Sequence, residues 1–130
     1  MSTVPPTDLD VVDAMFRAIE SGDFDAYRRT VSPDTTVWTN FDAREQTFDQ
    51  VLATVTWLHG AVADLRYDIV RRETIPGGVV QQHVLRGTAS GGTVLAMPAT
   101  VWCTITDGVV SRMEEYLDPR GVKALFRPAG

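Results

Sequence analysis

The sequence contains only one cysteine, Cys103, among its 130 residues. A single cysteine cannot form an intramolecular disulfide, and no cysteine or histidine spacing resembles that of a zinc site. The N-terminal residues have neither the basic segment nor the apolar segment of a signal peptide, and no apolar run approaches the roughly 20 residues of a membrane span. We therefore expect a cytoplasmic protein without a metal site.

The sequence also has little positive charge. Lysine and arginine number 12 against 17 acidic residues, the formal net charge is −5, and no basic run compensates locally. Nucleic acid and anionic membranes attract basic surfaces, so neither is expected as a partner. A small neutral or apolar ligand suits this composition better. Internal repeats and low-complexity segments are absent.

Apolar residues make up 44% of the chain, which at this length is enough for the core of one domain. We expect residues 1–6 to form a flexible lead, because Pro5 and Pro6 block regular structure. Residues 7–127 should form the single domain, and residues 128–130 a short tail.

Apolar residues recur at helical spacing in three segments of the first half of the chain. These segments predict helices over residues 7–20, 23–30 and 47–60. Each begins at a residue whose side chain can accept hydrogen bonds from free backbone N–H groups, namely Thr7, Asp23 and Thr47. An Asp-Pro pair at residues 118–119 predicts a short C-terminal helix that continues to about residue 126.

The remaining segments alternate apolar and polar residues and predict strands over residues 35–41, 64–75, 79–89, 93–106 and 109–117, with a polar loop at 42–46. Turns rich in glycine join the last four strands, so these should pair as an antiparallel meander. Pro98 cannot donate to a strand ladder, so we expect a bulge or bend there. The order predicts an α+β fold in which a curved antiparallel sheet forms a cone-shaped half-barrel around the three N-terminal helices.

Two of the predicted strands place polar side chains in otherwise apolar rows. Gln81 and His83 share one strand face, and Glu115 shares a face with residues 109, 111, 113 and 117. A polar side chain that faces a core costs free energy unless it is hydrogen-bonded. His83 and Glu115 therefore indicate either a structural pair or a lined cavity in which histidine and glutamate transfer protons at neutral pH.

Three segments carry a resemblance to a known family: residues 21–27 (SGDFDAY), residues 33–38 (PDTTVW), and residues 107–118, which begin with DGVV and end with EEYLD. They resemble the SnoaL-like branch of the nuclear transport factor 2-like superfamily, and the resemblance covers roughly residues 9–126. This branch includes ketosteroid isomerases, polyketide cyclases, scytalone dehydratase and limonene-type epoxide hydrolases. The resemblance implies the cone fold, while one such fold hosts many chemistries.

The chain matches the catalytic pattern of limonene-type epoxide hydrolases only in part. That pattern has Tyr-x-Asn on the first strand, Arg-x-Asp on the third and an Asp base on the last. Here Trp38 and Asn40 stand at the first motif, so only the asparagine matches. Gln81 and His83 stand at the Arg and Asp positions, and Glu115 stands at the base.

The spacing Gln81-x-His83 is more similar to a Gln-x-His pair of some SnoaL-like aldol cyclases. Those cyclases carry their acid on the following strand, at about Met97 here, so that role is vacant. The aspartate base of ketosteroid isomerases would fall near residues 38–40 and is missing as well. None of these subfamilies matches residue for residue.

Two classes of function remain open. The first is an enzyme without a cofactor that acts by acid–base catalysis on a small apolar metabolite with a carbonyl group, as a cyclase, isomerase or dehydratase, or alternatively on an epoxide. In it His83 transfers the proton and Glu115 orients or assists it. The expected substrate-binding residues are Phe16, Trp38, Asn40, Gln81, Met97 and Met113. The second class is a non-catalytic module for ligand binding or dimerisation.

Strand alternation places a further group of side chains on the outer face of the predicted sheet. Trp102 should lie there with Val94, Thr100 and Thr104, and Tyr116 should join them from the last strand. An exposed tryptophan on an open sheet face favours a homodimer that pairs the outer faces of two sheets.

Overall fold

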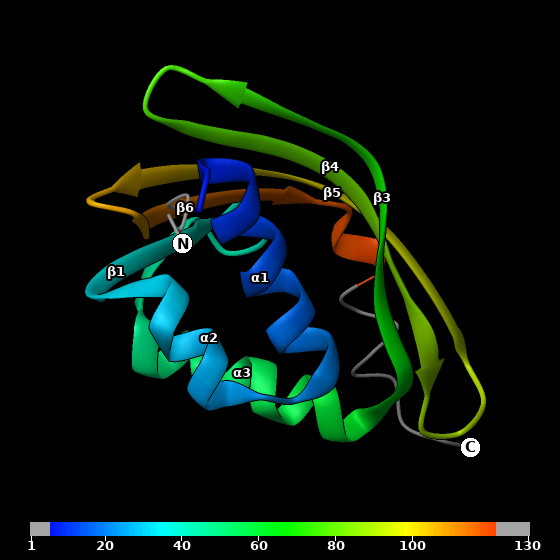
Figure 1. Ribbon diagram of the computed structural model, residues 1–130. Helices are drawn as coiled ribbons and strands as arrows, with labels where there is room; N and C mark the ends of the chain where they lie inside the picture. Colours follow the sequence, from blue (N-terminus) through cyan, green and yellow to red (C-terminus); the bar gives the residue numbers. More distant parts are fainter. Residues whose placement is uncertain (1–5, 122–130) are drawn as a thin grey trace, which may run out of the picture.

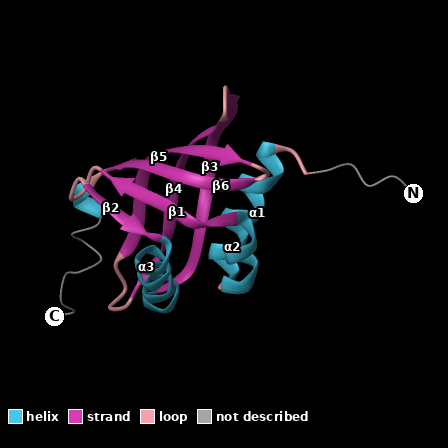
Figure 2. Ribbon diagram, turned by 90° about the vertical axis from the view of Figure 1, so that its left-hand side faces the viewer, coloured by secondary structure: helices cyan, strands magenta, loops and turns pink. Residues whose placement is uncertain are grey.

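A six-stranded sheet bends around three helices in the computed structural model, which describes residues 6–121 (Figure 1). The helices are α1 (Asp8–Ser21), α2 (Phe24–Thr30) and α3 (Phe48–Ala61). The strands are β1 (Val31–Thr39), β2 (Arg44–Thr47), β3 (Val62–Ile75), β4 (Gly78–Ala89), β5 (Val94–Thr106) and β6 (Val109–Leu117). All three helices lie on the same side of the sheet (Figure 2), which confirms the predicted α+β cone.

The local sequence sets the ends of the helices. The Thr7 hydroxyl accepts a hydrogen bond from the Asp10 N–H, and the Thr7 N–H donates to the Asp10 carboxylate. A second capping box begins α3 at Thr47. Helix α1 ends at Gly22, whose left-handed φ of 74° suits glycine, and the Asp23 carboxylate then caps α2.

The strands follow the order β2-β1-β6-β5-β4-β3 across the sheet. Strands β3 to β6 pair antiparallel with their neighbours in sequence, as predicted, and β1 extends the sheet by pairing with β6 in parallel. The predicted loop at residues 42–46 is wrong, because residues 44–47 form β2 and pair with β1. Three of the four side chains of β2 are exposed, so no apolar alternation marks this edge strand in the sequence.

A bulge in β6 shifts its side-chain alternation. The register with β5 changes between Thr104 and Ile105, which leaves Ser111 as an extra residue on β6. Val110 and Met113 are consequently both buried, although they are three residues apart. The predicted row of inward residues is therefore correct from Met113 onward and wrong for residues 109 and 111.

Pro98 lies in a regular part of β5, so of the bulge or bend expected there the bulge is not present. It is opposite Val84 on β4 without any register shift. Its carbonyl accepts a hydrogen bond from the Asp118 N–H, just beyond the last β5–β6 pair of Ala99 and Leu117. The backbone nitrogen and the carbonyl of a strand residue face the same neighbouring strand. The N–H that Pro98 lacks would therefore point to the place where β6 has already ended, so its absence removes no hydrogen bond between the strands.

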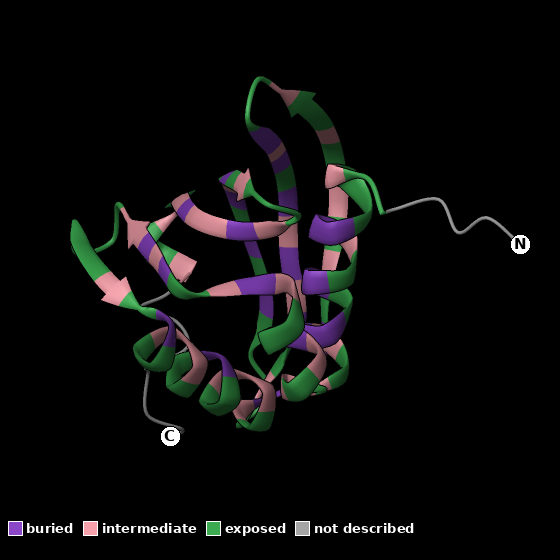
Figure 3. Ribbon diagram, turned by 60° about the vertical axis from the view of Figure 1, so that its left-hand side comes forward, coloured by how far each residue is buried: buried purple, intermediate pink, exposed green. Residues whose placement is uncertain are grey.

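The buried faces of the helices point toward the sheet (Figure 3) and form the main core with its inner side chains. Phe16 and Tyr27 are among the largest fully buried side chains of this core. A second, smaller cluster gathers where β3, β4 and β5 approach each other, and includes Leu85, Leu95 and Met97. Residues of both clusters border the cavity described below.

The chain continues beyond β6 with a helical turn at Pro119, Arg120 and Gly121. The Asp118 carboxylate accepts a hydrogen bond of 3.0 Å from the Arg120 N–H, as a helix cap does. The rest of the predicted C-terminal helix, the tail at residues 128–130 and most of the predicted flexible lead lie outside the described residues. Within residues 6–121, no helix combines the length and apolar character needed to cross a membrane.

Candidate active site

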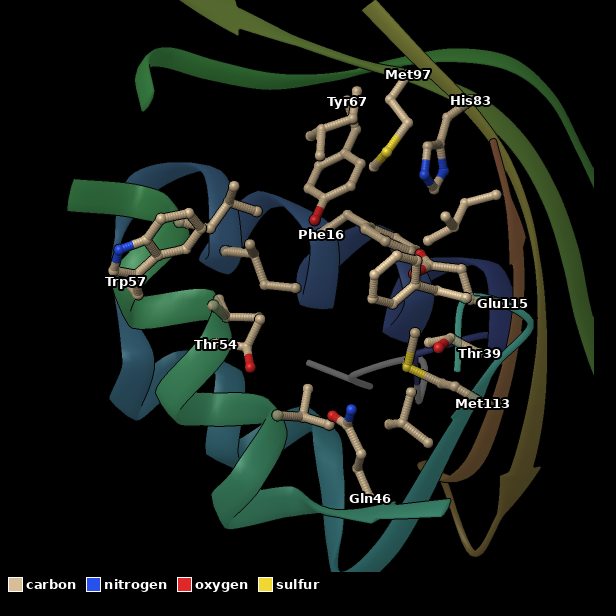
Figure 4. A pocket seen from close by; sticks show the side chains of 18 of the residues that line it. Phe16, Thr39, Gln46, Thr54, Trp57, Tyr67, His83, Met97, Met113 and Glu115 are labelled. Atoms are coloured by element: carbon tan, nitrogen blue, oxygen red, sulfur yellow. The ribbon is translucent and has the colours of Figure 1, made fainter. Parts of the chain in front are cut away.

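A cavity of about 300 Å³ lies between the inner face of the sheet and the helices α1 and α3 (Figure 4). Its wall is mostly apolar and aromatic, with a few polar groups, as is typical of a site for a small ligand. The lining residues are Phe16, Ile19, Tyr27, Val37, Thr39, Phe41, Asp42, Gln46, Val51, Thr54, Val55, Trp57, Leu58, Tyr67, His83, Leu85, Met97, Met113, Glu115 and Leu117.

Glu115 supplies a carboxyl group to the wall of this cavity. It lies on β6 between Thr39 of β1 and Val101 of β5. Within the described part of the chain, no side chain donates a hydrogen bond to this carboxyl group. Burial raises the pKa of Glu115 to about 7, because the charged form loses its water. At neutral pH the group is therefore poised either to accept or to give a proton.

His83 reaches the same cavity from β4 and is 2% exposed. The rings of Phe16 and Tyr67 pack against its ring in edge-to-face geometry, with centroid distances of 5.4 and 4.8 Å. Burial, together with the positive charge of Arg72, lowers the pKa of His83 to about 4. The imidazole is therefore neutral near pH 7. Among residues 6–121 no hydrogen bond joins His83 to Glu115, so the two side chains do not form a closed structural pair.

Gln81 lies behind the cavity wall and not in it, which corrects its expected contact with substrate. Its side chain is fully buried, and its amide Nε2 donates to Nδ1 of His83 at 2.8 Å. Its carbonyl Oε1 accepts a hydrogen bond of 2.6 Å from Nε of Arg72. Since Nδ1 of the imidazole accepts, the ring proton is on Nε2. Gln81 therefore contacts the imidazole and leaves Nε2–H as the group that a ligand can meet.

Tyr67 is a cavity residue that the sequence analysis did not select for the site. Figure 4 shows its ring reaching from β3 into the cavity beside Met97 and His83, with the hydroxyl at the leading end. Burial, together with the charge of Glu115, raises the pKa of Tyr67 well above its usual value, so the phenol keeps its proton. A tyrosine in an apolar strand row was the available signal, because its polar tip then points into the interior.

Three of the expected substrate-binding residues, Phe16, Met97 and Met113, line the cavity, and Trp38 does not. Its neighbour on β1, Val37, faces the cavity, so alternation turns Trp38 to the outer face. Its ring packs there against Tyr116 with a centroid distance of 5.3 Å.

Asn40 also lies outside the cavity wall, at the end of β1. Its Oδ1 accepts a hydrogen bond of 2.9 Å from the Leu117 N–H, and its Nδ2 donates to the Leu117 carbonyl at 3.2 Å. Its own N–H donates to the Glu115 carbonyl. Asn40 was expected to contact substrate or water. Its hydrogen bonds instead link the end of β1 to β6, the strand that carries Glu115.

Exposed aromatic side chains mark the opening of the cavity. Phe41 is 45% exposed and Trp57 is 43% exposed, although both line the cavity. Asp42 and Gln46, near or on β2, and Thr54 on α3 add polar groups to the same wall. The cavity therefore opens between the hairpin of β1 and β2 and the helix α3. Over residues 6–121, no cluster of His, Cys, Asp or Glu side chains is arranged to hold a metal ion.

The model of the SnoaL-like domain family matches residues 12–113 of the chain. Three solved structures show the same fold at low sequence identity. IdmH of Streptomyces antibioticus, a candidate polyketide cyclase, has a TM-score of 0.80 and 15% identity, over 92% of this chain and 98% of its own. A protein of Catenulispora acidiphila with a ketosteroid isomerase-like fold, in complex with trimethylamine, has a TM-score of 0.77 and 17% identity, over 97% of both chains.

AclR of Streptomyces galilaeus, a candidate hydroxylase, has a TM-score of 0.78 and 15% identity, over 88% of this chain and 77% of its own. No curated protein matches the chain in sequence. At such identities the solved structures show a shared fold, and a fold alone does not select one chemistry. The family model, however, spans most of the chain. The chain therefore belongs to the SnoaL-like domain family.

Proposed function

We propose that the protein is an enzyme without a cofactor that moves a proton on a small, largely apolar carbonyl compound. The proposal rests on Glu115, whose carboxyl group lines a mostly apolar cavity and has a pKa raised to about 7. A purely structural carboxylate in such a position would be paired or hydrogen-bonded. A general base with a pKa near the operating pH is the group that proton abstraction requires.

The geometry favours a division of roles that reverses the sequence-based expectation. His83 has a pKa lowered to about 4, and its Nδ1 is already engaged by Gln81. A neutral imidazole that presents N–H is a poor base and a good hydrogen-bond donor. Glu115 then transfers the proton, while His83 and Tyr67 donate hydrogen bonds to the substrate.

The reaction that fits these groups begins with a carbonyl oxygen held by Nε2–H of His83 and the hydroxyl of Tyr67. The Glu115 carboxylate takes a proton from the carbon next to the carbonyl, and the electron pair of the broken C–H bond moves onto the carbonyl oxygen. The two donors stabilise this enolate as it forms. Return of the proton from Glu115 to another carbon gives an isomer. Alternatively, the enolate carbon attacks a second carbonyl of the same molecule, the π bond of that carbonyl breaks, and its oxygen takes the proton from Glu115, which completes an aldol ring closure.

The cavity wall also limits the class of substrate. Among the described lining residues there is no lysine or arginine, and the acidic groups are Asp42 and Glu115. An anionic ligand would meet these acids without a compensating cation, so phosphates and carboxylates are disfavoured. The epoxide hydrolase pattern would need a cation between two carboxyl groups, and Arg72 does not line the cavity. A neutral carbonyl compound of modest size meets both conditions.

Hydrogen–deuterium exchange tests the proposal without knowledge of the natural substrate. A panel of cyclic ketones, enones and β-diketones is incubated with the protein in D₂O, and NMR follows exchange at the carbon next to the carbonyl. The wild-type protein should accelerate exchange in at least one compound. The variant Glu115→Gln should slow that exchange by about 10²- to 10⁴-fold, which is the typical contribution of a general base.

The neighbouring residue provides a matched control. Glu114 lies next to Glu115 on β6, is not part of the cavity wall, and forms an ion pair of 3.2 Å with Arg112. Glu114→Gln should therefore exchange the panel at the wild-type rate. Equal rates in Glu115→Gln and wild type would contradict the proposal. A panel ketone that binds in the cavity without any exchange would instead support the non-catalytic binding module.

A further inference from the structure

A chain of side-chain contacts runs from helix α1 to the His83 ring. Asp13 on α1 accepts a hydrogen bond of 2.9 Å from Nη1 of Arg72, which lies on β3. Nε of Arg72 donates to Oε1 of Gln81 at 2.6 Å, and Nε2 of Gln81 lies 2.8 Å from Nδ1 of His83. Three elements, α1, β3 and β4, thus contribute to one chain of contacts that ends at the cavity.

The direction of these hydrogen bonds follows from the chemistry of arginine. A guanidinium group has five N–H donors and no acceptor. The group that Gln81 turns toward Arg72 must therefore be its carbonyl oxygen, and the amide NH₂ must face His83. Nδ1 of the imidazole then has to accept, which places the ring proton on Nε2. Without Arg72 the Gln81 amide could turn over, and its oxygen would then favour the proton on Nδ1.

We infer that Arg72 and Gln81 are positioning residues that hold His83 in the tautomer whose Nε2–H donates into the cavity. This inference rests on the proposed function for its consequence in catalysis, because it assigns a hydrogen-bond donor to the carbonyl oxygen of the substrate. It also explains the state of Glu115. An imidazole with its lone pair directed away from the cavity cannot take a proton from that carboxyl group, and it forms no ion pair that would lower the pKa of Glu115.

The surroundings of Arg72 support a role beyond packing. Its Nη2 atom is buried without a hydrogen-bond partner among the described residues, which is an unfavourable arrangement for a charged group. The ion pair with Asp13, whose side chain is 47% exposed, offsets only part of this cost. A guanidinium with one buried nitrogen that has no partner, and whose Nε orients Gln81, is the pattern expected when stability gives way to function.

Several other ionisable groups face His83 or its immediate neighbours from the surrounding elements. They are Asp13 and Glu20 on α1, Tyr67 and Arg72 on β3, Cys103 on β5 and Glu115 on β6. The pKa values of Tyr67 and Cys103 are raised by burial, so both stay neutral near pH 7. Among the described cavity residues whose pKa is shifted, Glu115 is therefore the one that changes charge near neutral pH.

Nitrogen NMR of the histidine rings reads the tautomer directly and needs no substrate. The chain has two histidines, His59 and His83, and the variant His59→Gln assigns the signals. The wild-type His83 ring should show a protonated Nε2 and an unprotonated Nδ1, unchanged from about pH 5.5 to about pH 8, where an ordinary histidine titrates. A His83 that becomes doubly protonated in this range, or that carries its proton on Nδ1, would overturn the inference.

The variant Gln81→Glu keeps the shape of the side chain and removes its only donor. One carboxylate oxygen can still accept from Arg72, while the other can accept only from a protonated Nδ1 of His83. The ring proton should therefore move from Nε2 to Nδ1. The variant Arg72→Met should give a mixture of both tautomers, because the Gln81 amide is then free to turn.

Arg71 provides the control for the arginine variant. It is the neighbouring arginine on β3, is exposed, and pairs with Glu73 at 3.2 Å. Arg71→Met should leave the His83 spectrum as in the wild type. An unchanged spectrum in both Gln81→Glu and Arg72→Met would overturn the inference, and either variant suffices if the other fails to fold.

The same variants separate this inference from the proposed function. On a compound that the wild-type protein exchanges, Gln81→Glu should lower kcat about 10²-fold, as the loss of one oxyanion donor does, with little change in KM. If no compound is exchanged but the tautomer moves in Gln81→Glu, the positioning role stands and the proposed reaction fails. If exchange is observed but the tautomer does not move, the positioning role fails alone.

Discussion

Glu115 and His83 shift in opposite directions because burial disfavours the charged form of each. The carboxyl group of Glu115 is pushed toward its neutral, protonated form and has a pKa of about 7. The imidazole of His83 is pushed toward its neutral, unprotonated form and has a pKa of about 4. Both groups are therefore neutral over the interval between the two values, and the cavity then contains no ionised Glu115 or His83. Only above about pH 7 is Glu115 mostly in the carboxylate form that can act as a base.

These two shifts predict opposite dependences of stability on pH. A glutamate with a usual pKa of 4.5 binds more protons in the folded state between about 4.5 and 7, so its contribution to stability falls as pH rises through this window. A histidine with a usual pKa of 6.5 binds fewer protons in the folded state between about 4 and 6.5, so its contribution rises with pH. The two nearly cancel between about pH 4.5 and 6.5.

We expect Glu115→Gln to remove the contribution of Glu115 to the pH dependence of stability and to leave that of His83. Its free energy of unfolding should rise with pH from about 4 to 6.5 and should exceed that of the wild type above pH 7, by on the order of 3 kcal/mol at most. Urea unfolding at a series of pH values measures both effects. Glu114→Gln is the control and should keep the wild-type profile, so a parallel change in both variants would contradict the buried state of Glu115.

Tyr67 carries a second prediction at this scale. Its hydroxyl has no hydrogen-bond partner among the described residues, so Tyr67→Phe should leave the free energy of unfolding nearly unchanged. If the hydroxyl stabilises an enolate, kcat for exchange of a panel ketone should fall by about 10²-fold while KM changes little. Tyr116→Phe, on the outer face, should retain wild-type kinetics. A rise in KM alone would assign Tyr67 to binding and remove it from the proposed mechanism.

At the scale of the elements, β6 depends on β1 to hold Glu115 in place. The parallel pairing of the two strands ends where the Asn40 side chain exchanges two hydrogen bonds with the backbone of Leu117. We expect Asn40→Ala to destabilise the protein by about 1–2 kcal/mol, because two backbone groups lose their partners. Chemical denaturation measures this loss. Gln82→Ala, which truncates an exposed amide on β4, is the control and should change stability by less than about 0.5 kcal/mol.

The elements also show where sequence patterns suffice and where they do not. The capping residues Thr7, Asp23 and Thr47 predicted the starts of the three helices, because a cap is a local hydrogen bond. The strand β2 was missed, because an exposed edge strand has no apolar row. The bulge at Ser111 was missed as well, since an extra residue is a property of two paired strands and leaves no mark in the sequence of either.

The same reasoning explains which residues of the cavity could be predicted from the sequence. Strand alternation and family resemblance together brought His83, Glu115 and Met113 to one cavity. Alternation predicts which face of the sheet a side chain lies on, but not whether it lines the cavity or is covered by other residues. Gln81 shares the face of His83, yet it is sealed behind the wall, because helix α1 and Arg72 cover that end of the strand.

The outer face of the sheet carries a last proposal, that two copies of the chain pair through it. The helices cover only the inner face of the sheet (Figure 2). The outer face leaves Trp102 46% exposed, Tyr116 47% exposed and Val94 77% exposed. Large apolar side chains on an open sheet face are typical of a protein interface. We expect a dimer in sedimentation velocity at micromolar concentration.

The variant Trp102→Glu tests this proposal by placing a charge on that face. Two such charges would face each other across a symmetric interface and lose their water, so the dimer should dissociate. Phe41→Glu is the matched control, since Phe41 is 45% exposed at the cavity opening and away from the outer face. It should weaken ligand binding and leave the dimer intact. A monomeric wild-type protein, or a Trp102→Glu variant that keeps the dimer mass, would show that this face has no partner of its own kind. The sheet would then be stabilised within one copy of the chain, by the helices that pack against its inner face.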